Sequence, residues 1–325
     1  MGFFKLRSVI SLNDIQAGAA LDIQESDFSL QTSDDKFLQF EYVEEERKLS
    51  PYPVKPGVFT ITKTMTGMDL IPTTFTQDKI LKDLLSTKNV TERIDKFFDR
   101  LHVYYEEGIE IPKRGALLYG PAGTGKSSSI STIVEKYAGD NKTIIISWST
   151  DTFEASDVKR FFKSFDYQGV ERMILIAEDI GGIENDQATI RSDSSLLSLL
   201  DNKEKTFKVP IYILATTNFP QNLMGNLTNR PDRFDDKIEV GYPPAIARVE
   251  LLKFYLKDSA TEEAIKLIES KKCDEFTPAH IREIRIRSKI HDKAVEEVIK
   301  EISQEIEMYK KAFSKQRSMS MGFVD

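Results

Sequence analysis

Short apolar runs and helical stretches alternate along the middle of the chain. The apolar runs are rich in β-branched residues, and in the stretches between them apolar residues recur at helical spacing. This alternation is typical of a parallel sheet that helices cover on both faces. The expected strands are residues 115–120, 142–149, 172–179 and 209–218. Three helices are expected between them: one that begins near Lys126, one over 156–165 and one over 194–202.

The chain on either side of this region has a different pattern. Before it, alternating β-branched and aromatic residues at 37–46 and 57–65 predict strands. From Asn89 onward the spacing becomes helical, and Asn89 with Glu92 suits a helix cap. After the α/β region the pattern is helical throughout. We therefore predict a β-rich or mixed module for substrate docking or assembly over 1–88, an α/β domain over 89–243, a helical lid over 244–312 and a disordered tail over 313–325.

Composition limits the class of protein. Of the 325 residues, 40% are hydrophobic and 30% charged, which is ordinary for a globular chain. The net charge of −7 argues against a chain whose main task is to hold nucleic-acid phosphates. The single cysteine, Cys273, excludes an internal disulfide, and three histidines offer no Cys/His metal cluster. Because neither a signal peptide nor a long apolar segment is found, we expect a cytoplasmic protein with no membrane span.

The segment "GPAGTGKS" fits the phosphate-binding pattern G-x-x-x-x-G-K-[ST] between an expected strand and an expected helix. In such a loop, glycines let backbone N–H groups face the phosphates, and the helix N-terminus adds its positive dipole. We expect Lys126 to reach the β and γ phosphates of ATP and Ser127 to coordinate Mg²⁺. The predicted ATP-binding residues are Gly120, Pro121, Ala122, Gly123, Thr124, Gly125, Lys126, Ser127 and Ser128.

Two adjacent acids follow the apolar strand "ILIA", namely Glu178 and Asp179. A nucleotide site needs an acid that faces Mg²⁺ and a group that orients the attacking water, both at the carboxyl end of a neighbouring strand. This pair meets that requirement. ATP-hydrolysing sheets usually carry Asp before Glu, so the order is reversed here.

Four segments together resemble the AAA clade of the AAA+ ATPases over roughly residues 88–312. They are "IPKRGALLYGPAGTGKSSSI", the acidic strand end, "ILATTN" and "NRPDRFDDKIEVGYPP". The resemblance implies an α/β fold with a P-loop parallel sheet and a C-terminal helical lid. It also implies that ATP is hydrolysed with Mg²⁺ at the subunit interfaces of a homo-oligomeric ring, a hexamer or heptamer.

The resemblance also implies roles for individual side chains. Asn218 of "ATTN" stands on the family's first-sensor position, where a polar side chain helps to hold the attacking water. Arg230 and Arg233 of "RPDRFD" stand on the two arginine-finger positions, which reach the γ-phosphate of the neighbouring subunit and stabilise the transition state in trans. The alternative is that the two arginines only pair with aspartates of the same segment.

The acid order is similar to one branch of the family. The segments "SWSTDTFEASDVKRFF" and "LIAEDIGGIE" are similar to mitochondrial AAA chaperones that move the folded Rieske iron–sulfur protein across a membrane, although their membrane anchor is absent from this sequence. This resemblance assigns the magnesium-water role to Glu178 and the water-polarising role to Asp179. A different register, with Ala177 and Glu178 on the two positions, leaves Glu178 as the base.

Two features depart from the family pattern. The loop after the second strand reads "TDTFEAS", with Phe153 as its only aromatic residue and no glycine, so a pore loop that threads polypeptide is not indicated. The alternatives for Phe153 are that it faces a central pore or that it packs within the loop. In "FTPAHI", Ala279 stands where other AAA+ branches place an arginine, and Arg282 is a candidate substitute, although we favour a solvated helix face for it.

We therefore predict a ring-forming ATPase that remodels or translocates a macromolecular partner, which we expect to be protein. One alternative is a DNA-acting loader or initiator, against which the acidic composition and the finger motif count. The other is a nucleotide-dependent scaffold with little turnover.

Overall fold

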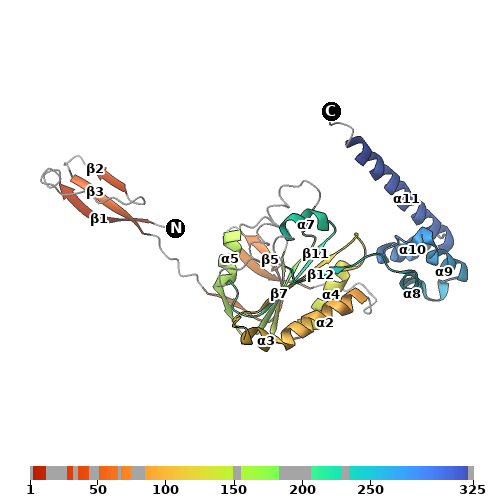
Figure 1. Ribbon diagram of the computed structural model, residues 1–325, viewed down its shortest axis with the longest axis horizontal. Coiled ribbons are helices and arrows are strands. Elements are labelled where there is room, and N and C mark those ends of the chain that lie inside the picture. Colours follow the sequence, from red (N-terminus) through yellow and green to blue (C-terminus); the bar gives the residue numbers. More distant parts are fainter. Residues whose placement is uncertain are drawn as a thin grey trace. The chain divides into compact units, whose positions relative to one another are not determined.

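The structure is a computed structural model in which the chain forms two compact units, Met1–Ser50 and Pro51–Asp325 (Figure 1). No helix among the described residues combines the length and apolar character needed to cross a membrane. The structure describes residues 3–11, 28–31, 36–43, 51–64, 67–74, 85–148, 155–182, 206–227 and 234–320, of which those up to 43 are described by their backbone alone.

The first unit contains an antiparallel sheet of three strands in the order β1-β3-β2. Its central strand β3 (Lys36–Val43) pairs with both β1 (Phe3–Ser11) and β2 (Phe28–Gln31). β3 overlaps the run that the sequence pattern predicts to be extended at 37–46 and begins one residue before it.

The second unit is built on a sheet of seven strands in the order β12-β7-β11-β10-β8-β5-β6. All neighbours pair in parallel except β5 and β6, which form an antiparallel hairpin. The four strands expected in the α/β region are all present. The strands are β5 (Gly57–Thr64), β6 (Gly67–Pro72), β7 (Lys113–Tyr119), β8 (Thr143–Trp148), β10 (Arg172–Ala177), β11 (Ile211–Thr217) and β12 (Asp236–Glu239), with a separate parallel pair of β4 (Tyr52–Val54) and β9 (Phe165–Tyr167).

The hairpin of β5 and β6 differs from the predicted domain division. We expected residues 1–88 to form one module, but β5 pairs in parallel with β8, from Gly57 opposite Ile144 to Thr60 opposite Ser147. Ile61 of the same strand is fully buried in the core of this sheet. The pairing covers β8, whose backbone N–H and C=O groups would otherwise lie at an open sheet edge.

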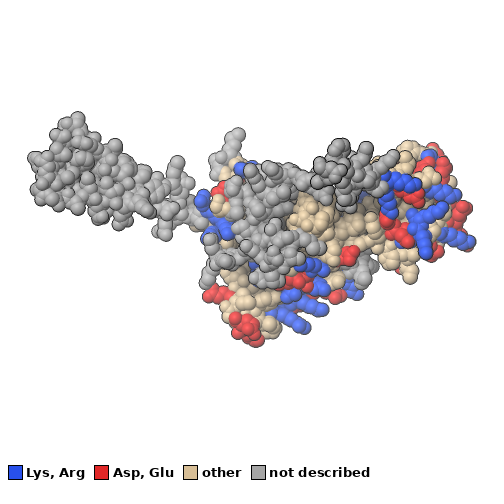
Figure 2. All heavy atoms as spheres, turned by 45° about the horizontal axis from the view of Figure 1, so that its top comes forward, with Lys and Arg blue, Asp and Glu red and all other residues tan. Residues whose placement is uncertain are grey.

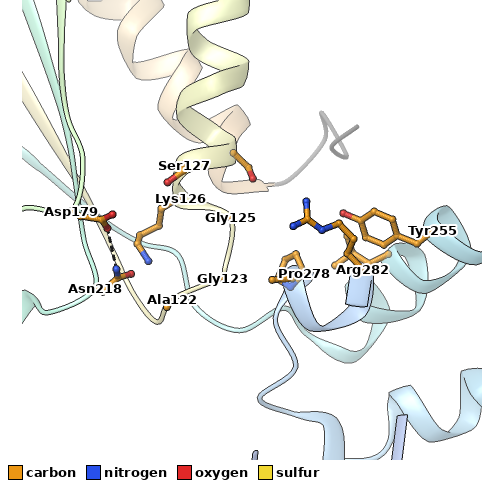
Figure 3. Close-up of a pocket in the computed structure, with 13 residues that line it drawn as sticks. Ala122, Gly123, Gly125, Lys126, Ser127, Asp179, Asn218, Tyr255, Pro278 and Arg282 are labelled. Carbon is orange, nitrogen blue, oxygen red and sulfur yellow. Dashed lines mark hydrogen bonds between the residues drawn. The ribbon is translucent and has the colours of Figure 1, made fainter. Parts of the chain in front are cut away.

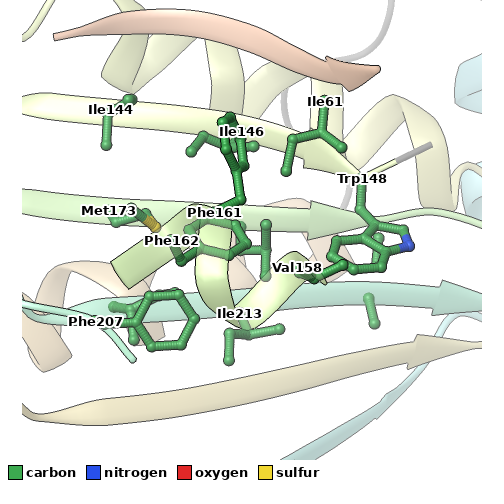
Figure 4. Packing of buried hydrophobic residues seen from close by; sticks show 14 of the residues in the cluster. Ile61, Ile144, Ile146, Trp148, Val158, Phe161, Phe162, Met173, Phe207 and Ile213 are labelled. Atoms are coloured by element: carbon green, nitrogen blue, oxygen red, sulfur yellow. The ribbon is translucent and has the colours of Figure 1, made fainter. Parts of the chain in front are cut away.

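Helices cover both faces of the sheet, and side chains of each strand alternate between the two resulting cores. On β10, Met173 and Leu175 face one core, whereas Ile174 and Ile176 face the other. The first core includes Phe162 and other aromatic residues of α5 (Figure 4). The helices of this part are α2 (Leu85–Asp99), α3 (Leu101–Glu106), α4 (Lys126–Ala138), α5 (Ala155–Ser164) and α7 (Pro220–Leu227).

Helix α2 begins four residues before the cap that the sequence pattern predicts. Asn89 therefore lies inside the helix, where its side-chain oxygen accepts a hydrogen bond from Arg93 Nε at 2.8 Å. The prediction of a cap at Asn89 is wrong because the helical pattern continues to its N-terminal side. The helix predicted over 194–202 lies outside the described residues.

The last third of the second unit is helical and has a hydrophobic core of its own. Its helices confirm the pattern that the sequence shows after residue 244. One correction concerns the tail, because the last helix continues to Ser320, whereas we expected disorder from residue 313. No glycine or proline occurs before Gly322 to end it. These helices are α8 (Ala245–Leu256), α9 (Glu262–Glu269), α10 (Pro278–Ile290) and α11 (Val295–Ser320).

Candidate nucleotide-binding site

Three segments that lie far apart in the sequence meet at one edge of the sheet. The strands β7, β11 and β10 are adjacent and parallel, so the residues that follow their carboxyl ends lie side by side. A cleft of about 280 Å³ opens there, facing the helical part (Figure 3). Its described lining consists of Ala122, Gly123, Gly125, Lys126, Ser127, Ser128, Asp179, Asn218, Leu251, Tyr255, Pro278, Ala279 and Arg282.

The phosphate-binding loop has a backbone that requires glycine. Gly120 has φ of 151°, and a Cβ atom there would lie 2.2 Å from the carbonyl oxygen of Val240. Gly125, with φ of 106°, is the N-cap residue of α4, so the loop leads directly into the N-terminus of that helix. The helix therefore directs its free N–H groups and its positive dipole end toward the cleft.

Lys126 is held against the loop, with only 5% of its surface exposed. Its ammonium group donates hydrogen bonds to the carbonyl oxygens of Gly120 and Pro121, both at 2.8 Å. Burial lowers the pKa of Lys126, and the negative charge of Asp179 opposes that shift. An incoming phosphate would replace the two carbonyl oxygens as acceptors of a charged donor.

Asp179 and Asn218 form the wall opposite the loop. Asn218 Nδ2 donates a hydrogen bond to Asp179 Oδ1 at 3.0 Å (Figure 3). Asp179 has φ of 52°, a left-handed conformation that Asp adopts more readily than most residues. Its backbone N–H donates to the hydroxyl of the buried Thr216 at 3.0 Å, which fixes this turn after β10. The structure thus brings together two of the predicted catalytic residues.

Glu178 is half-buried at the end of β10 and does not belong to the described lining of the cleft. The described lining offers the carboxylate of Asp179 on this side, next to Glu178, and the hydroxyl of Ser127 on the first turn of α4. Oxygen donors of this kind are the ligands that Mg²⁺ prefers, and the ion usually keeps waters and takes the remaining ligands from substrate phosphates. These residues therefore fit a bound magnesium ion.

The other wall of the cleft comes from the helical part, of which the sequence points only to Ala279 and Arg282. Leu251 and Tyr255 lie one turn apart on α8, and Pro278 is the first residue of α10. Thr277 caps α10 in a capping box with His280, and "TPAH" carries the usual signal of an N-cap followed by proline. That signal predicts where the helix begins but does not indicate that it faces a nucleotide.

Arg282 lines the cleft and points toward the loop in Figure 3. This differs from the solvated helix face that we favoured for Arg282, which begins a basic stripe on α10 that also contains Arg285, Arg287 and Lys289. Arg285, further along the helix, donates to the carbonyl oxygen of Tyr255, and Arg287 pairs with Glu283 and Glu305. Only the first arginine of the stripe therefore lines the cleft.

Arg230, Arg233 and Phe153 lie outside the described residues. Two aspartates that follow Arg233 have partners elsewhere. Asp235 accepts a hydrogen bond from Gly115 N at 2.8 Å, and Asp236 pairs with Arg93 and Arg114.

Comparison with known proteins agrees with this geometry. Residues 116–242 match the model of the family described as "ATPase family associated with various cellular activities (AAA)". The ATP-dependent zinc metalloprotease FtsH of Clostridium perfringens is 31% identical over 204 residues, which cover 58% of this chain and 27% of the relative. The 26S proteasome regulatory subunit 7 of Caenorhabditis elegans is 30% identical over 202 residues, covering 56% and 43%.

A plant protein gives a similar result. The AAA-ATPase At3g50940 of Arabidopsis thaliana is 31% identical over 230 residues, covering 65% of this chain and 48% of the relative. The chain spans about a quarter to a half of the length of these curated relatives. The match over residues 116–242 confirms the predicted α/β fold and the ATPase class.

Proposed function

We propose that the chain is a ring-forming ATPase that hydrolyses ATP at subunit interfaces and uses the energy to remodel or move a protein partner. The observation that carries the proposal is the cleft between the phosphate-binding loop and the wall of Asp179 and Asn218. Two relatives carry names that refer to a metalloprotease and a proteasome subunit, which supports a protein as partner.

The loop residues Gly120–Ser128, except Pro121, would bind the phosphates through their backbone N–H groups, and the Lys126 ammonium would add a charged hydrogen bond. Ser127 and Glu178, the latter through water, would hold Mg²⁺, which neutralises charge on the β and γ phosphates when bound. Asp179 would accept the proton of the attacking water, and Asn218 would orient that water. The order of Glu178 and Asp179 supports similarity to the Rieske-protein translocase branch.

Phosphate release by the full chain tests the proposal. Lys126→Ala should abolish release, because the γ-phosphate loses its only lysine donor in the described lining of the cleft. Lys136→Ala, on an exposed face of the same helix, is the matched control. Equal release in the wild type and in Lys126→Ala would refute hydrolysis at this site and favour a scaffold with little turnover.

Hydrolysis at subunit interfaces predicts complementation. Arg230→Ala subunits lack a finger but keep their own phosphate-binding loop, and Lys126→Ala subunits have the opposite defect. Mixed rings should therefore recover part of the activity that either variant lacks alone. If mixed rings form, as measured by mass photometry, but stay inactive, the fingers do not act in trans.

A further inference from the structure

A second groove lies on the α/β part, away from the nucleotide cleft. Its volume is about 480 Å³, and its lining comes from α2, α3 and the amino-terminal ends of β7 and β12. Arg114 lies at the start of β7, whereas the phosphate-binding loop follows the end of the same strand at Tyr119. At about 3.3 Å per residue the two sites are roughly 20 Å apart. A ligand in this groove is therefore not a part of the nucleotide site.

The groove is basic, in contrast to the chain as a whole. Four cations and two acids line it, a net charge of about +2, whereas the whole chain carries −7. Figure 2 shows Lys and Arg side chains gathered on the α/β part as well as on the helical part, with acidic side chains among them. We call this feature the basic groove and define it by Lys96, Phe97, Arg100, Tyr104 and Arg114.

Two of the four cations are already engaged. Arg93 and Arg114 both pair with the carboxylate of Asp236, of which only 9% is exposed. Lys96 and Arg100 have no ion pair or hydrogen bond of their side chains within the part of the chain that the structure describes. Lys96 lies in the last turn of α2, and Arg100 is the residue between α2 and α3; both line the same groove. A ligand with two negative groups would find two cations available.

The floor of the groove is apolar. Phe97 is 3% exposed and packs edge-on against Tyr104, with ring centroids 5.6 Å apart. The hydroxyl of Tyr104 accepts a hydrogen bond from Arg114 Nη1 at 3.3 Å, which fixes the ring at the rim. Val103 adds an exposed apolar side chain. The floor therefore suits an aliphatic or aromatic side chain between the charged groups of a ligand.

The length of the groove suits an extended peptide. Its lining follows α2 from Asn89 to Phe97, which at 1.5 Å per residue is about 12 Å, and it continues to Arg100 beyond the end of that helix. An extended chain rises about 3.3 Å per residue, so a segment of about four residues matches the helical part of the groove. Glu92, which is exposed in the same lining, would repel the continuous negative charge of a nucleic-acid backbone. A peptide with spaced acidic residues keeps its carboxylates away from Glu92.

We propose that the basic groove binds an extended acidic segment of a protein partner. Carboxylates of the segment pair with Lys96 and Arg100, and an apolar side chain between them lies on Phe97 and Val103. Binding is independent of ATP at the nucleotide cleft, so it stands or falls separately from the proposed hydrolysis.

Fluorescence anisotropy of the full chain tests this proposal. The probe is a fluorescein-labelled peptide of the sequence Glu-Leu-Glu-Asp-Leu-Glu, with Gln-Leu-Gln-Asn-Leu-Gln as its uncharged match. The double variant K96E/R100E should bind the acidic peptide at least tenfold more weakly than the wild type. Its matched control is K88E/K237E, which changes the same charge at exposed positions of α2 and β12 outside the described lining. The control should bind within threefold of the wild type.

A salt titration and a milder double variant complete the test of the basic groove. The affinity for the acidic peptide should fall as salt rises from 50 to 300 mM, because partly exposed ion pairs are screened. K96Q/R100Q serves as a milder variant if the charge reversal impairs folding, which circular dichroism would detect. Equal binding of the two peptides, equal affinity in both double variants, or stronger binding of a ten-nucleotide oligo-dT at the same residues would each overturn the proposal.

Discussion

The substitution Asp179→Asn tests the catalytic role of the Asp179 carboxylate without changing the local structure of the candidate site. The φ of 52° at this position is one that Asn adopts as readily as Asp. Asp179 Oδ1 accepts its hydrogen bond from Asn218 at 3.0 Å, and an amide oxygen accepts the same bond. The backbone hydrogen bond to Thr216 does not involve the side chain at all. The substitution therefore keeps the size, the turn and the contacts, and it removes one negative charge.

The expected effects on stability and on rate differ in size. The side chain is exposed, and a hydrogen bond to a charged group that becomes neutral loses about 1 kcal/mol. A general base contributes about 10²–10⁴-fold, or roughly 3–5 kcal/mol of activation free energy. Phosphate release at saturating ATP should therefore fall at least a hundredfold. Thermal unfolding and the binding of a fluorescent ATP analogue should change little, because the phosphate-binding loop is intact.

Glu178→Gln is the matched comparison. If Glu178 holds Mg²⁺ through water, its loss should raise the Mg²⁺ concentration needed for half-maximal release, whereas Asp179→Asn should not. Release by Asp179→Asn within threefold of the wild type would refute its role as the base. A hundredfold loss in Glu178→Gln at saturating Mg²⁺ would then favour the register in which Glu178 is the base.

Three further predictions concern the loop, the helical wall and stability. Gly123→Ala places an alanine at φ of 77° with its Cβ 3.0 Å from the Thr277 hydroxyl, so both ATP affinity and the free energy of unfolding should fall, the latter by about 1–2 kcal/mol. The control is Gly139→Ala, where the added Cβ meets open space and neither quantity should change. Nucleotide titration and urea unfolding measure the two effects. Arg282→Ala should weaken binding of the ATP analogue about tenfold, and Arg282→Lys should retain most of it; equal affinity of all three proteins would show that this cation does not reach the nucleotide. Burial raises the pKa of Asp140, but the hydrogen bonds from Arg172 and Thr143 lower it by more, so the net pKa lies below the usual value for an aspartate. The stability that Asp140 contributes is therefore present at neutral pH and is lost as the pH falls through this lowered pKa. Urea unfolding should therefore show a wild-type advantage over Asp140→Asn that is constant from pH 7 to 5 and shrinks below about pH 4, and an advantage that grows on acidification would contradict this sign.

The strands around the nucleotide cleft could be predicted because both of their faces are buried. In β10 the residues from Met173 to Ala177 have no exposed surface, so the strand is a continuous apolar run that ends at the first acid. β11 is also buried along its whole length, and β8 is buried except at Ser147. The phosphate-binding motif then indicates which strand end carries the nucleotide site, because glycines and a lysine at this spacing seldom occur together outside phosphate-binding loops.

The hairpin of β5 and β6 could not be assigned in the same way. Local alternation indicates a strand at Gly57–Thr64 but not the sheet that it joins, and its partner β8 follows some eighty residues later. The helical wall has a similar difficulty. Leu251 and Tyr255 recur at helical spacing like any core residues, and only the packing of α8 and α10 shows that their side chains line a cleft.

The contact between the loop and α10 explains why the cleft depends on both parts. The carbonyl oxygen of Gly123 accepts a hydrogen bond from Ala279 N at 3.4 Å, and the hydroxyl oxygen of the buried Thr277, which caps the helix, would lie 3.0 Å from a Cβ at Gly123. Arg282 follows one turn later on the same helix. A rearrangement of the loop around phosphates would therefore displace the first turn of α10 through backbone contacts, and it would move Arg282 with that turn. Because the helical part has its own core, it would respond as a body, so substitutions at Gly123 should alter nucleotide binding and the position of α10 together.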